Sequence, residues 1–238
     1  MFRALFKSLS ARLPSQCAVC RAWPAQPVCE ACVVQFAQPR PRCRTCALPV
    51  VGAIEQCGAC VRSPPPLDAC VAAVAYEYPW SHLIVEFKFG ARPGWASSFA
   101  MLLRSAPWVE PALENADLIL PMPLSAQRMR ERGFNQALEL VRQLAPGRNG
   151  HGLLLRIRDT PPQSALKRAE RLQNVRHAFA VEPLRIDELA GAKVVLVDDV
   201  MTSGASMYAA ADTLRAAGAA HITGLVLARA DPPHGNSR

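Results

Sequence analysis

The spacing of the cysteines constrains the fold of this chain more than any other feature of its sequence. Eight of the nine cysteines form four Cys-x-x-Cys pairs within a stretch of 44 residues. The pairs are Cys17/Cys20, Cys29/Cys32, Cys43/Cys46 and Cys57/Cys60. Two residues between ligands let one tight turn direct both sulfurs at the same ion, and two such turns complete a tetrahedral zinc site. We therefore predict that these eight cysteines hold one or two structural Zn²⁺ ions.

The four turns can be combined into sites in more than one way. Sequential sites, with the first four cysteines around one ion and the last four around another, need the shortest loops. A crossed arrangement and the loss of one site are the alternatives. A disulfide scaffold would require an oxidising compartment. The start of the chain lacks the apolar stretch and small-residue cleavage site of an export signal, so we expect a reduced, cytoplasmic protein.

A proline-rich run, Ser63-Pro64-Pro65-Pro66, has the composition of a stiff linker. We expect it to separate a zinc module, residues 1–66, from a second domain, residues 67–238. The module carries eight basic and two acidic side chains, which favours a polyanionic partner such as nucleic acid. Zinc bound by thiolates would remove about four of these positive charges, so charge alone is weak support. No apolar run approaches the roughly 20 residues of a membrane span.

Beyond residue 67, strand-like apolar runs alternate with helical patterns. The strand-like runs are 71–78, 117–124, 193–200 and 221–229, and the helix-like ones are 81–90, about 134–145, and 205–217. This alternation predicts an α/β domain with a mainly parallel sheet and helices on both faces. Ligands of such sheets bind at the carboxyl ends of the strands. Cys70 belongs to none of the Cys-x-x-Cys pairs, and we expect it to be a small buried hydrophobic residue.

The end of the 193–200 run carries the clearest binding signal. Asp198 and Asp199 close a β-branched run, and a turn then leads into an Ala-rich helix. The turn is formed by Met201, Thr202, Ser203, Gly204, Ala205 and Ser206. Free N–H groups at a helix start suit a phosphate, and the two carboxylates are placed to accept hydrogen bonds from ribose hydroxyls. The alternative is an ordinary strand-to-helix turn with a hydroxyl cap.

Basic side chains elsewhere can complete such a site. Arg128 and Arg132 lie four residues apart after a strand-like run, so they can share a helix face and grip a diphosphate. A solvated helix face is the alternative. The connection 156–179 is also rich in arginine and lysine, and a plain basic surface loop is its competing interpretation. Neither the P-loop motif nor the dinucleotide-binding glycine motif occurs in the chain.

The segment 194–206 resembles the phosphoribosyl pyrophosphate signature of type I phosphoribosyltransferases. Two further stretches narrow the resemblance to the ComF family. The first is Pro121-Met122-Pro123-Leu124-Ser125, Arg128 and Arg132-Gly133-Phe134-Asn135-Gln136. The second is Arg158-Asp159-Thr160, Gln163, Leu166, Arg171, Asn174-Val175 and Ala178-Phe179. With Lys88 and the cysteine pairs, the likeness covers nearly the whole chain, although Ser203 and Ser206 stand where the family often has threonine.

The resemblance implies a type I phosphoribosyltransferase-like domain preceded by a small double zinc-ribbon-like module. It implies phosphoribosyl pyrophosphate as ligand, bound with Mg²⁺, and a loop within 156–179 that closes over it. The residues that the resemblance assigns to catalysis are Arg128, Arg132, Thr160, Gln163, Arg171 and Lys88. Lys88 is carried by the resemblance alone, and a lysine at the edge of the core is the alternative.

The leading expectation for function is a phosphoribosyl pyrophosphate-binding protein of the phosphoribosyltransferase class. The resemblance also implies a role in natural competence and DNA uptake, with contact to single-stranded DNA and to a helicase-type partner. A non-catalytic accessory protein is the alternative; it would bind single-stranded DNA and use the ribose-phosphate site only for binding or sensing. No segment is typical of nucleobase recognition, so the acceptor stays open.

Overall fold

The computed structural model describes residues 15–90, 92–148, 150–158 and 177–231 of the 238-residue chain. Its contacts divide the chain into two compact units, residues 1–38 and 39–238. In the first unit, the described part contains a β-bridge between Ser15 and Ala25 and helix α2 (Glu30–Phe36). The second half of the cysteine segment therefore belongs to the same compact unit as the α/β domain. The domain boundary between residues 66 and 67 stays a prediction.

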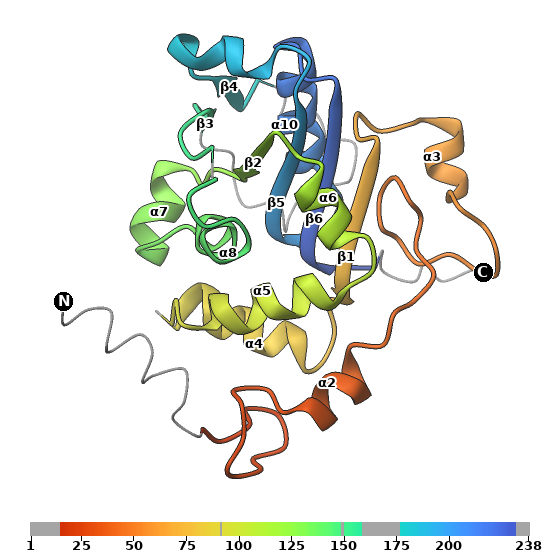
Figure 1. Cartoon of the computed structure of the whole chain (residues 1–238), viewed down its shortest axis with the longest axis vertical. Coiled ribbons are helices and arrows are strands. Elements are labelled where there is room, and N and C mark those ends of the chain that lie inside the picture. Colours follow the sequence, from red (N-terminus) through yellow and green to blue (C-terminus); the bar gives the residue numbers. More distant parts are fainter. Residues whose placement is uncertain (1–14, 91, 149, 159–176, 232–238) are drawn as a thin grey trace. The chain divides into compact units, whose positions relative to one another are not determined.

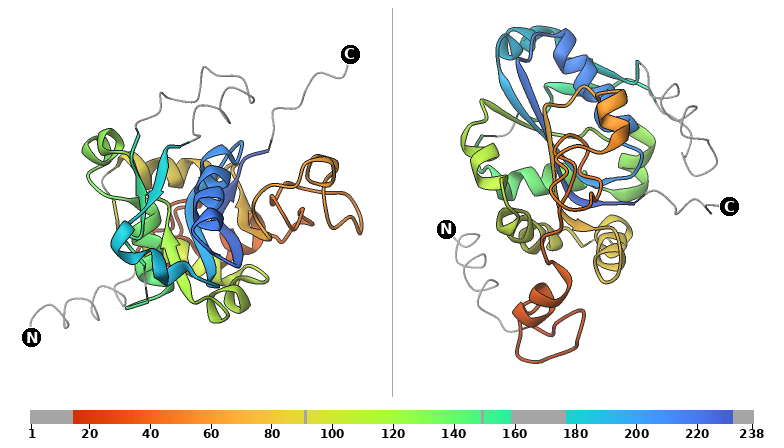
Figure 2. Two further views of the ribbon diagram at one scale, coloured as in Figure 1. Left: turned by 90° about the horizontal axis from the view of Figure 1, so that it is seen from above. Right: turned by 90° about the vertical axis from the view of Figure 1, so that its right-hand side faces the viewer.

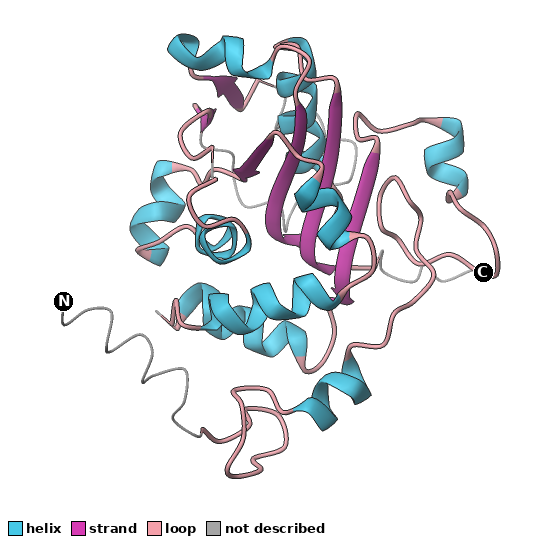
Figure 3. Cartoon of the chain, viewed as in Figure 1, coloured by secondary structure: helices cyan, strands magenta, loops and turns pink. Residues whose placement is uncertain are grey.

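Four parallel strands form the main sheet of the second unit (Figures 1 and 3). In spatial order they are β1 (Ala69–Ala75), β6 (His221–Arg229), β5 (Lys193–Met201) and β2 (Leu118–Pro121). The long central strands β5 and β6 consist largely of buried apolar residues, because helices cover both faces of a parallel sheet. All four strands run in the same direction, so their carboxyl ends share one edge.

The two faces of the sheet are covered by different helices. Val194 and Leu196 of β5 share a core cluster with Leu214 of α10 (Ala205–Ala216). Val195 and Val197, which alternate with them and so point to the opposite face, are also buried. On that face α8 (Gln136–Leu144) contacts β5 and β2, and α5 (Trp95–Ser105) contacts β1 and β6. The views in Figure 2 show α10 lying along the sheet.

The other elements are short. A hairpin-like antiparallel pair, β3 (Leu154–Arg156) and β4 (Phe179–Val181), packs beside α10. The remaining helices are α3 (Gly58–Arg62), α4 (Trp80–Phe89), α6 (Val109–Glu114), α7 (Ala126–Arg132) and the 3₁₀ helix η2 (Pro183–Leu189). Every described helix is too short or too polar to cross a membrane.

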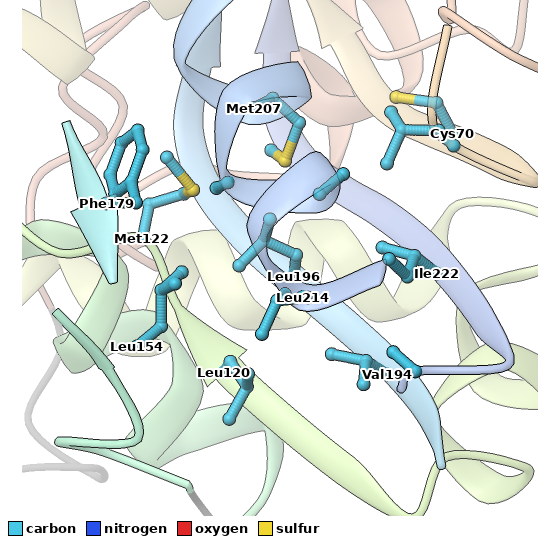
Figure 4. Packing of buried hydrophobic residues seen from close by; sticks show 14 of the residues in the cluster. Cys70, Leu120, Met122, Leu154, Phe179, Val194, Leu196, Met207, Leu214 and Ile222 are labelled. Atoms are coloured by element: carbon cyan, nitrogen blue, oxygen red, sulfur yellow. The ribbon is translucent and has the colours of Figure 1, made fainter. Parts of the chain in front are cut away.

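The core on the α10 face joins these elements. Figure 4 shows Leu196 and Leu214 near its centre, with Leu154 and Phe179 closing it on the side of β3 and β4. Cys70 lies in the same cluster with 4% of its surface exposed, which confirms that it is a buried hydrophobic residue. Its thiol is therefore unavailable as a ninth ligand on the surface.

The strands predicted from the apolar runs are present, and the run 221–229 has the same limits in the structure. The run 117–124 forms a shorter strand that ends at Pro121, since neither Pro121 nor Pro123 has an N–H group for a longer ladder. The helix face expected at Arg128 and Arg132 is part of α7, whose limits were not predicted from the sequence. The helix ends at Gly133, whose φ of 76° reverses the chain before α8 begins.

Candidate functional site

The carboxyl ends of β2 and β5 open onto a cavity of about 240 Å³. This is the edge at which parallel α/β sheets bind ligands. The last residues of β5, the turn after it and the start of α10 form one wall, residues 198–207. The other walls are formed by Lys88, Met122, Pro123, Leu124, Arg128, Arg132 and Arg156. Two carboxylates and four cationic side chains therefore surround one small space.

The turn between β5 and α10 depends on Gly204. Its φ is +84°, and a Cβ atom there would lie 2.6 Å from Cζ of Tyr208 and 2.7 Å from Cε of Met201. No other residue fits both this backbone and this space. The side chain of Ser203 accepts a hydrogen bond from the N–H of Ala205 at 3.3 Å. The first N–H groups of α10 point toward the cavity end of the helix, where the helix dipole favours an anion.

The acidic pair has two different environments. Asp199 is 5% exposed, and its Oδ1 lies 2.9 Å from Nζ of Lys88. Asp198 accepts a hydrogen bond at 2.9 Å from the N–H of Asp199. Burial, followed by the charge of Asp199, raises the pKa of Asp198 to about 7, against the opposing effect of Lys88. The two neighbouring acids thus differ: Asp199 is ion-paired with Lys88, and Asp198 has a pKa raised to about 7.

Arg132 is held in place and still has unused hydrogen-bonding capacity. Its Nη1 donates to Oε1 of Gln136 at 2.9 Å, and its guanidinium lies 5.4 Å from the ring centre of Phe89. Its Nε atom is buried and has no hydrogen-bond partner among the described residues. A buried donor without a partner is costly, so an acceptor bound in the cavity would be stabilised by it.

The segment between β2 and α8 explains how these cations are positioned. Ser125 caps α7 by accepting a hydrogen bond from the N–H of Arg128 at 3.4 Å. Asn135 caps α8 by accepting from Leu138 at 3.3 Å, and its side-chain amide donates to the carbonyl of Met122 at 3.0 Å. From Arg132 to Gln136 the chain therefore ends α7, reverses direction at the left-handed Gly133 and begins α8. The hydrogen bond of Asn135 attaches this segment to Met122, directly after β2.

The cavity brings together most of the residues that the sequence singled out. Lys88, Arg128, Arg132 and all eight residues named in the 198–206 segment line it. Thr160, Gln163 and Arg171 lie outside the described residues. Arg156 also lines the cavity but was not predicted as a site residue, and its guanidinium lies 5.5 Å from the ring centre of Phe179. Its position at the end of β3, just before the basic connection, was the available signal.

The cysteines form two separate clusters in sequential order. Cys17, Cys20, Cys29 and Cys32 make the first, and Cys43, Cys46, Cys57 and Cys60 make the second. Within each cluster the four sulfurs lie within 4.8 Å of one another. The separations across Cys17/Cys32, Cys20/Cys29 and Cys46/Cys57 are 3.8, 3.6 and 3.7 Å.

These separations match a metal site. Four sulfurs bound tetrahedrally to Zn²⁺ at about 2.3 Å lie about 3.8 Å from one another, whereas a disulfide brings them to about 2.05 Å. All nine described cysteines are free thiols. The clusters can thus hold two zinc ions, and the sequential grouping is confirmed over the crossed one.

The clusters also favour thiolates at one position each. Burial raises the pKa of Cys17, but backbone N–H donors at Cys20, Cys29 and Val19 outweigh it and bring the pKa down to about 6. In the second cluster, backbone donors at Cys57, Thr45 and Cys46 likewise overcome burial and lower the pKa of Cys43 to about 6. Thiolate is the form that binds zinc.

Comparison with known proteins agrees with this geometry. A model of the phosphoribosyl transferase domain matches residues 139–237, which include β5, the turn and α10. The chain is 31% identical over 225 residues to the DNA utilization protein YhgH of Salmonella typhimurium, covering 88% of this chain and 95% of that protein.

Two competence proteins are also similar. Competence protein F of Haemophilus influenzae is 32% identical over 211 residues, or 85% of this chain and 90% of that protein. Competence protein ComFC of Bacillus subtilis is 34% identical over 113 residues, covering 47% of this chain and 44% of that protein. The chain therefore belongs to the ComF family of phosphoribosyltransferase-like proteins.

Proposed function

We propose that this protein binds phosphoribosyl pyrophosphate with Mg²⁺ in the 240 Å³ cavity and holds it for transfer of the ribosyl group. The observation that carries the proposal is the placement of an acidic pair, a helix start and several cationic side chains around one space. Each part of the ligand has a matching group. A nucleotide triphosphate or dinucleotide would need a different phosphate loop, and neither corresponding motif occurs.

The roles follow from the chemistry of each group. The turn 202–206 receives the 5′-phosphate through backbone N–H groups and hydroxyls. Asp198 and Asp199 accept hydrogen bonds from the ribose hydroxyls, and Lys88 keeps Asp199 oriented. Arg128 and Arg132 face the diphosphate, for which the unpartnered Nε of Arg132 is a ready donor. Thr160, Gln163 and Arg171 are proposed to contribute from the connection that precedes β4.

Transfer would break the bond between ribose C1 and the diphosphate oxygen. The electron pair of that bond leaves with the diphosphate, while an acceptor nucleophile bonds to C1 and its proton passes to solvent. Positive charge builds up at C1 and negative charge on the leaving group, so the cationic side chains stabilise the leaving diphosphate. Mg²⁺ held by the diphosphate would supply further charge neutralisation.

We extend the proposal to DNA. The relatives carry names that refer to DNA utilization and competence, and the family resemblance implies single-stranded DNA and a helicase-type partner. Zinc in both cysteine clusters and a reducing, cytoplasmic location belong to the same proposal, supported by the free thiols and their spacing. Arg40 and Arg42, which precede the third cysteine pair, and Arg44, which lies inside it, are the groups proposed to contact DNA phosphates.

Calorimetry tests the ligand directly. Phosphoribosyl pyrophosphate with Mg²⁺ is expected to bind more tightly than ribose 5-phosphate or diphosphate, because it uses all parts of the cavity at once. Replacing Asp198 and Asp199 together by Asn should weaken binding by about 2–4 kcal/mol. Asp117→Asn is the matched control, since Asp117 accepts from the N–H of Lys193 at the opposite end of β5. Equal affinity of the double variant and the control would refute the assigned ribose contacts.

A further inference from the structure

Arg229 is a buried arginine at the carboxyl end of β6. It is 3% exposed, and its guanidinium donates to backbone carbonyls alone among the described residues. Nε donates to the carbonyl of Cys46 at 2.8 Å. Nη1 donates to the carbonyl of Met201 at 2.9 Å, to that of Thr202, and to that of Ala230 at 2.7 Å. One side chain thus reaches three separate segments of the second unit.

The acceptors of Arg229 belong to two functional parts. Cys46 is a member of the second cysteine cluster and ends the turn that starts at Cys43. Met201 is the last residue of β5, and Thr202 is the first residue of the turn proposed to bind the 5′-phosphate. Arg229 is not among the residues that line the cavity itself. It can therefore affect a ligand there only through the backbone that it holds.

Further contacts join the same two parts. Tyr208 of α10 packs against the cluster of Cys43, Cys46 and Cys60, and its ring covers the space beside Gly204. The N–H of Cys70 in β1 donates to the carbonyl of Arg44, within the Cys43–Cys46 turn, at 2.7 Å. In Figures 1 and 2 the orange segment that holds the second cluster accordingly lies beside β1.

A buried guanidinium is stable only while its donors are matched by acceptors. A metal ion in the second cluster would hold the carbonyl of Cys46 in place, because both ends of its turn would bind that ion. If the turn opens, Arg229 loses this acceptor and its remaining hydrogen bonds to Met201 and Thr202 lose their fixed geometry. The phosphate turn would then sample more conformations and bind a phosphate less well.

We propose that Arg229 is a positioning residue that couples metal occupancy of the second cysteine cluster to ribose-phosphate affinity at the turn 202–206. The first cluster lacks any such connection among the described contacts of Arg229, so it should have no part in the coupling. The inference rests on the proposed function for its ligand. Coupling is reciprocal, so the sugar phosphate should also retain zinc in the second cluster by the same factor.

A double-mutant cycle tests the proposal on the full chain. Cys57→Ser with Cys60→Ser disables the second cluster, and Cys29→Ser with Cys32→Ser is the matched control in the first. Each pair is measured in the wild-type, Arg229→Gln and Arg229→Lys backgrounds. The readouts are calorimetric affinity for phosphoribosyl pyrophosphate with Mg²⁺, and the rate of zinc release to a chelator. Arg215→Gln is the arginine control, because Arg215 donates to the carbonyls of Ala219 and Ala220 before β6 begins.

We expect loss of the second cluster to weaken ligand affinity on the order of tenfold in the wild-type background, within the usual range of coupling between sites. In the Arg229→Gln background the same change should cost less than about twofold, since the link is already gone. Arg229→Lys should restore part of the coupling, because an ammonium can still donate to some of the carbonyls. Ligand should slow zinc release from the second cluster alone, and this effect should vanish in Arg229→Gln.

Amide hydrogen exchange shows whether each variant is folded and whether its phosphate turn has loosened. Protection of Val194–Val197 in every variant shows that the sheet is folded. Loss of the second cluster should speed exchange at residues 202–206, whether or not the sugar phosphate binds. No binding by the wild type would therefore refute the proposed function while leaving the exchange result to decide the coupling. Equal affinity losses in the wild-type and Arg229→Gln backgrounds, or equal losses from either cluster, would overturn the coupling itself.

Discussion

Desolvation in the partly buried site and the neighbouring charge of Asp199 raise the pKa of Asp198 to about 7. A carboxyl group with a raised pKa destabilises the folded state at pH values at which it must ionise. Its pKa in the folded state, about 7, lies above the value of 3.8 expected in an unfolded chain. As the pH rises from about 4 to 7, the unfolded chain releases the proton first, so the folded state becomes relatively less stable. Perturbed acids of this kind are typical of binding sites.

Asp198→Asn should remove this penalty. The variant is expected to be more stable than the wild type at pH 8, by up to about 4 kcal/mol, with the difference vanishing below about pH 4. Asparagine keeps an oxygen that can accept from the N–H of Asp199, so the local hydrogen bond survives. Urea unfolding at several pH values measures the effect. A variant that is less stable than wild type at pH 8 would show that Asp198 is not strained.

Ionisation of Asp198 should have the opposite effect on ligand affinity, which it should raise. Ribose hydroxyls donate better to a carboxylate than to a carboxylic acid, so affinity should rise as the pH passes through about 7 and then level off. The phosphate groups of the ligand titrate near pH 6 and contribute their own slope. Calorimetry with Asp198→Asn isolates that slope, and the difference between the two proteins reports Asp198. Parallel pH profiles for the two proteins would contradict the ribose role.

Contiguous residues were the predictable part of the site. Asp198, Asp199 and the turn after them stand together in the sequence, and the β-branched run before them fixes which strand end they occupy. Contacts across the fold were not predictable. Lys88 meets Asp199, Arg156 meets Phe179 and Arg229 meets Cys46 only because parallel strands and the second cluster bring distant segments together. Composition and spacing carry no information on such pairs.

At the scale of elements, the junction of β5 and α10 is the most demanding part of the fold. Gly204→Ala should destabilise the protein by about 1–3 kcal/mol and weaken ligand binding by more than tenfold, because the new methyl group meets Tyr208 and Met201. Gly191→Ala is the control. Its φ of +71° is similarly strained, but nothing lies within 4 Å of the added atom, so it should lose stability and keep its affinity. Equal affinities would show that the turn does not contact the ligand.

The cysteine turns make a separate prediction about metal. Purified protein should contain two Zn²⁺ per chain, and a strong chelator should abolish amide protection in residues 17–36 while Val194–Val197 stay protected. Re-addition of zinc should restore the protection. The physical reason is that the described part of the first unit holds little buried apolar surface besides its cysteines. Full protection in metal-free protein, or stable disulfides, would contradict the zinc assignment.

Elements were predictable to different degrees. Buried apolar runs gave all four strands of the sheet, because a parallel strand covered on both faces leaves a continuous apolar signature. The limits of helix α7 were not predictable, since it buries no side chain and so lacks a periodic apolar stripe. The division at residue 38 was also not apparent from composition, because the packing of residues 39–66 on the sheet depends on contacts such as that of Arg229 with Cys46.

At the scale of the whole molecule, three arginines at the third cysteine pair are proposed to contribute to the binding of single-stranded DNA. Arg40 pairs with Glu77 at 2.5 Å, Arg44 pairs with Glu55 at 3.4 Å, and Arg42 donates to the carbonyl of Ala47 at 3.0 Å. Exposed ion pairs contribute little and exchange easily for phosphate contacts. Replacing all three arginines by Ala should therefore lower the magnitude of the salt slope of single-stranded DNA binding by about two. Oligonucleotide anisotropy across a salt series measures it.

The matched control replaces three arginines outside the segment that is proposed to contact DNA. Arg104, Arg142 and Arg185 also pair with acids, namely Glu110, Glu139 and Glu188, and none lies in a cysteine cluster or lines the cavity. Their replacement should leave the slope unchanged. A wild-type slope near zero, or the same change in both triple variants, would exclude the proposed DNA contact while leaving the sugar-phosphate site intact.

A crystal structure with phosphoribosyl pyrophosphate and Mg²⁺ would show where the ribose phosphate binds. We expect the 5′-phosphate against the amides of residues 202–206, the ribose hydroxyls on Asp198 and Asp199, and the diphosphate beside Arg128 and Arg132. Electron density for the ligand elsewhere, or a cavity that holds only water at saturating ligand, would refute the proposed site.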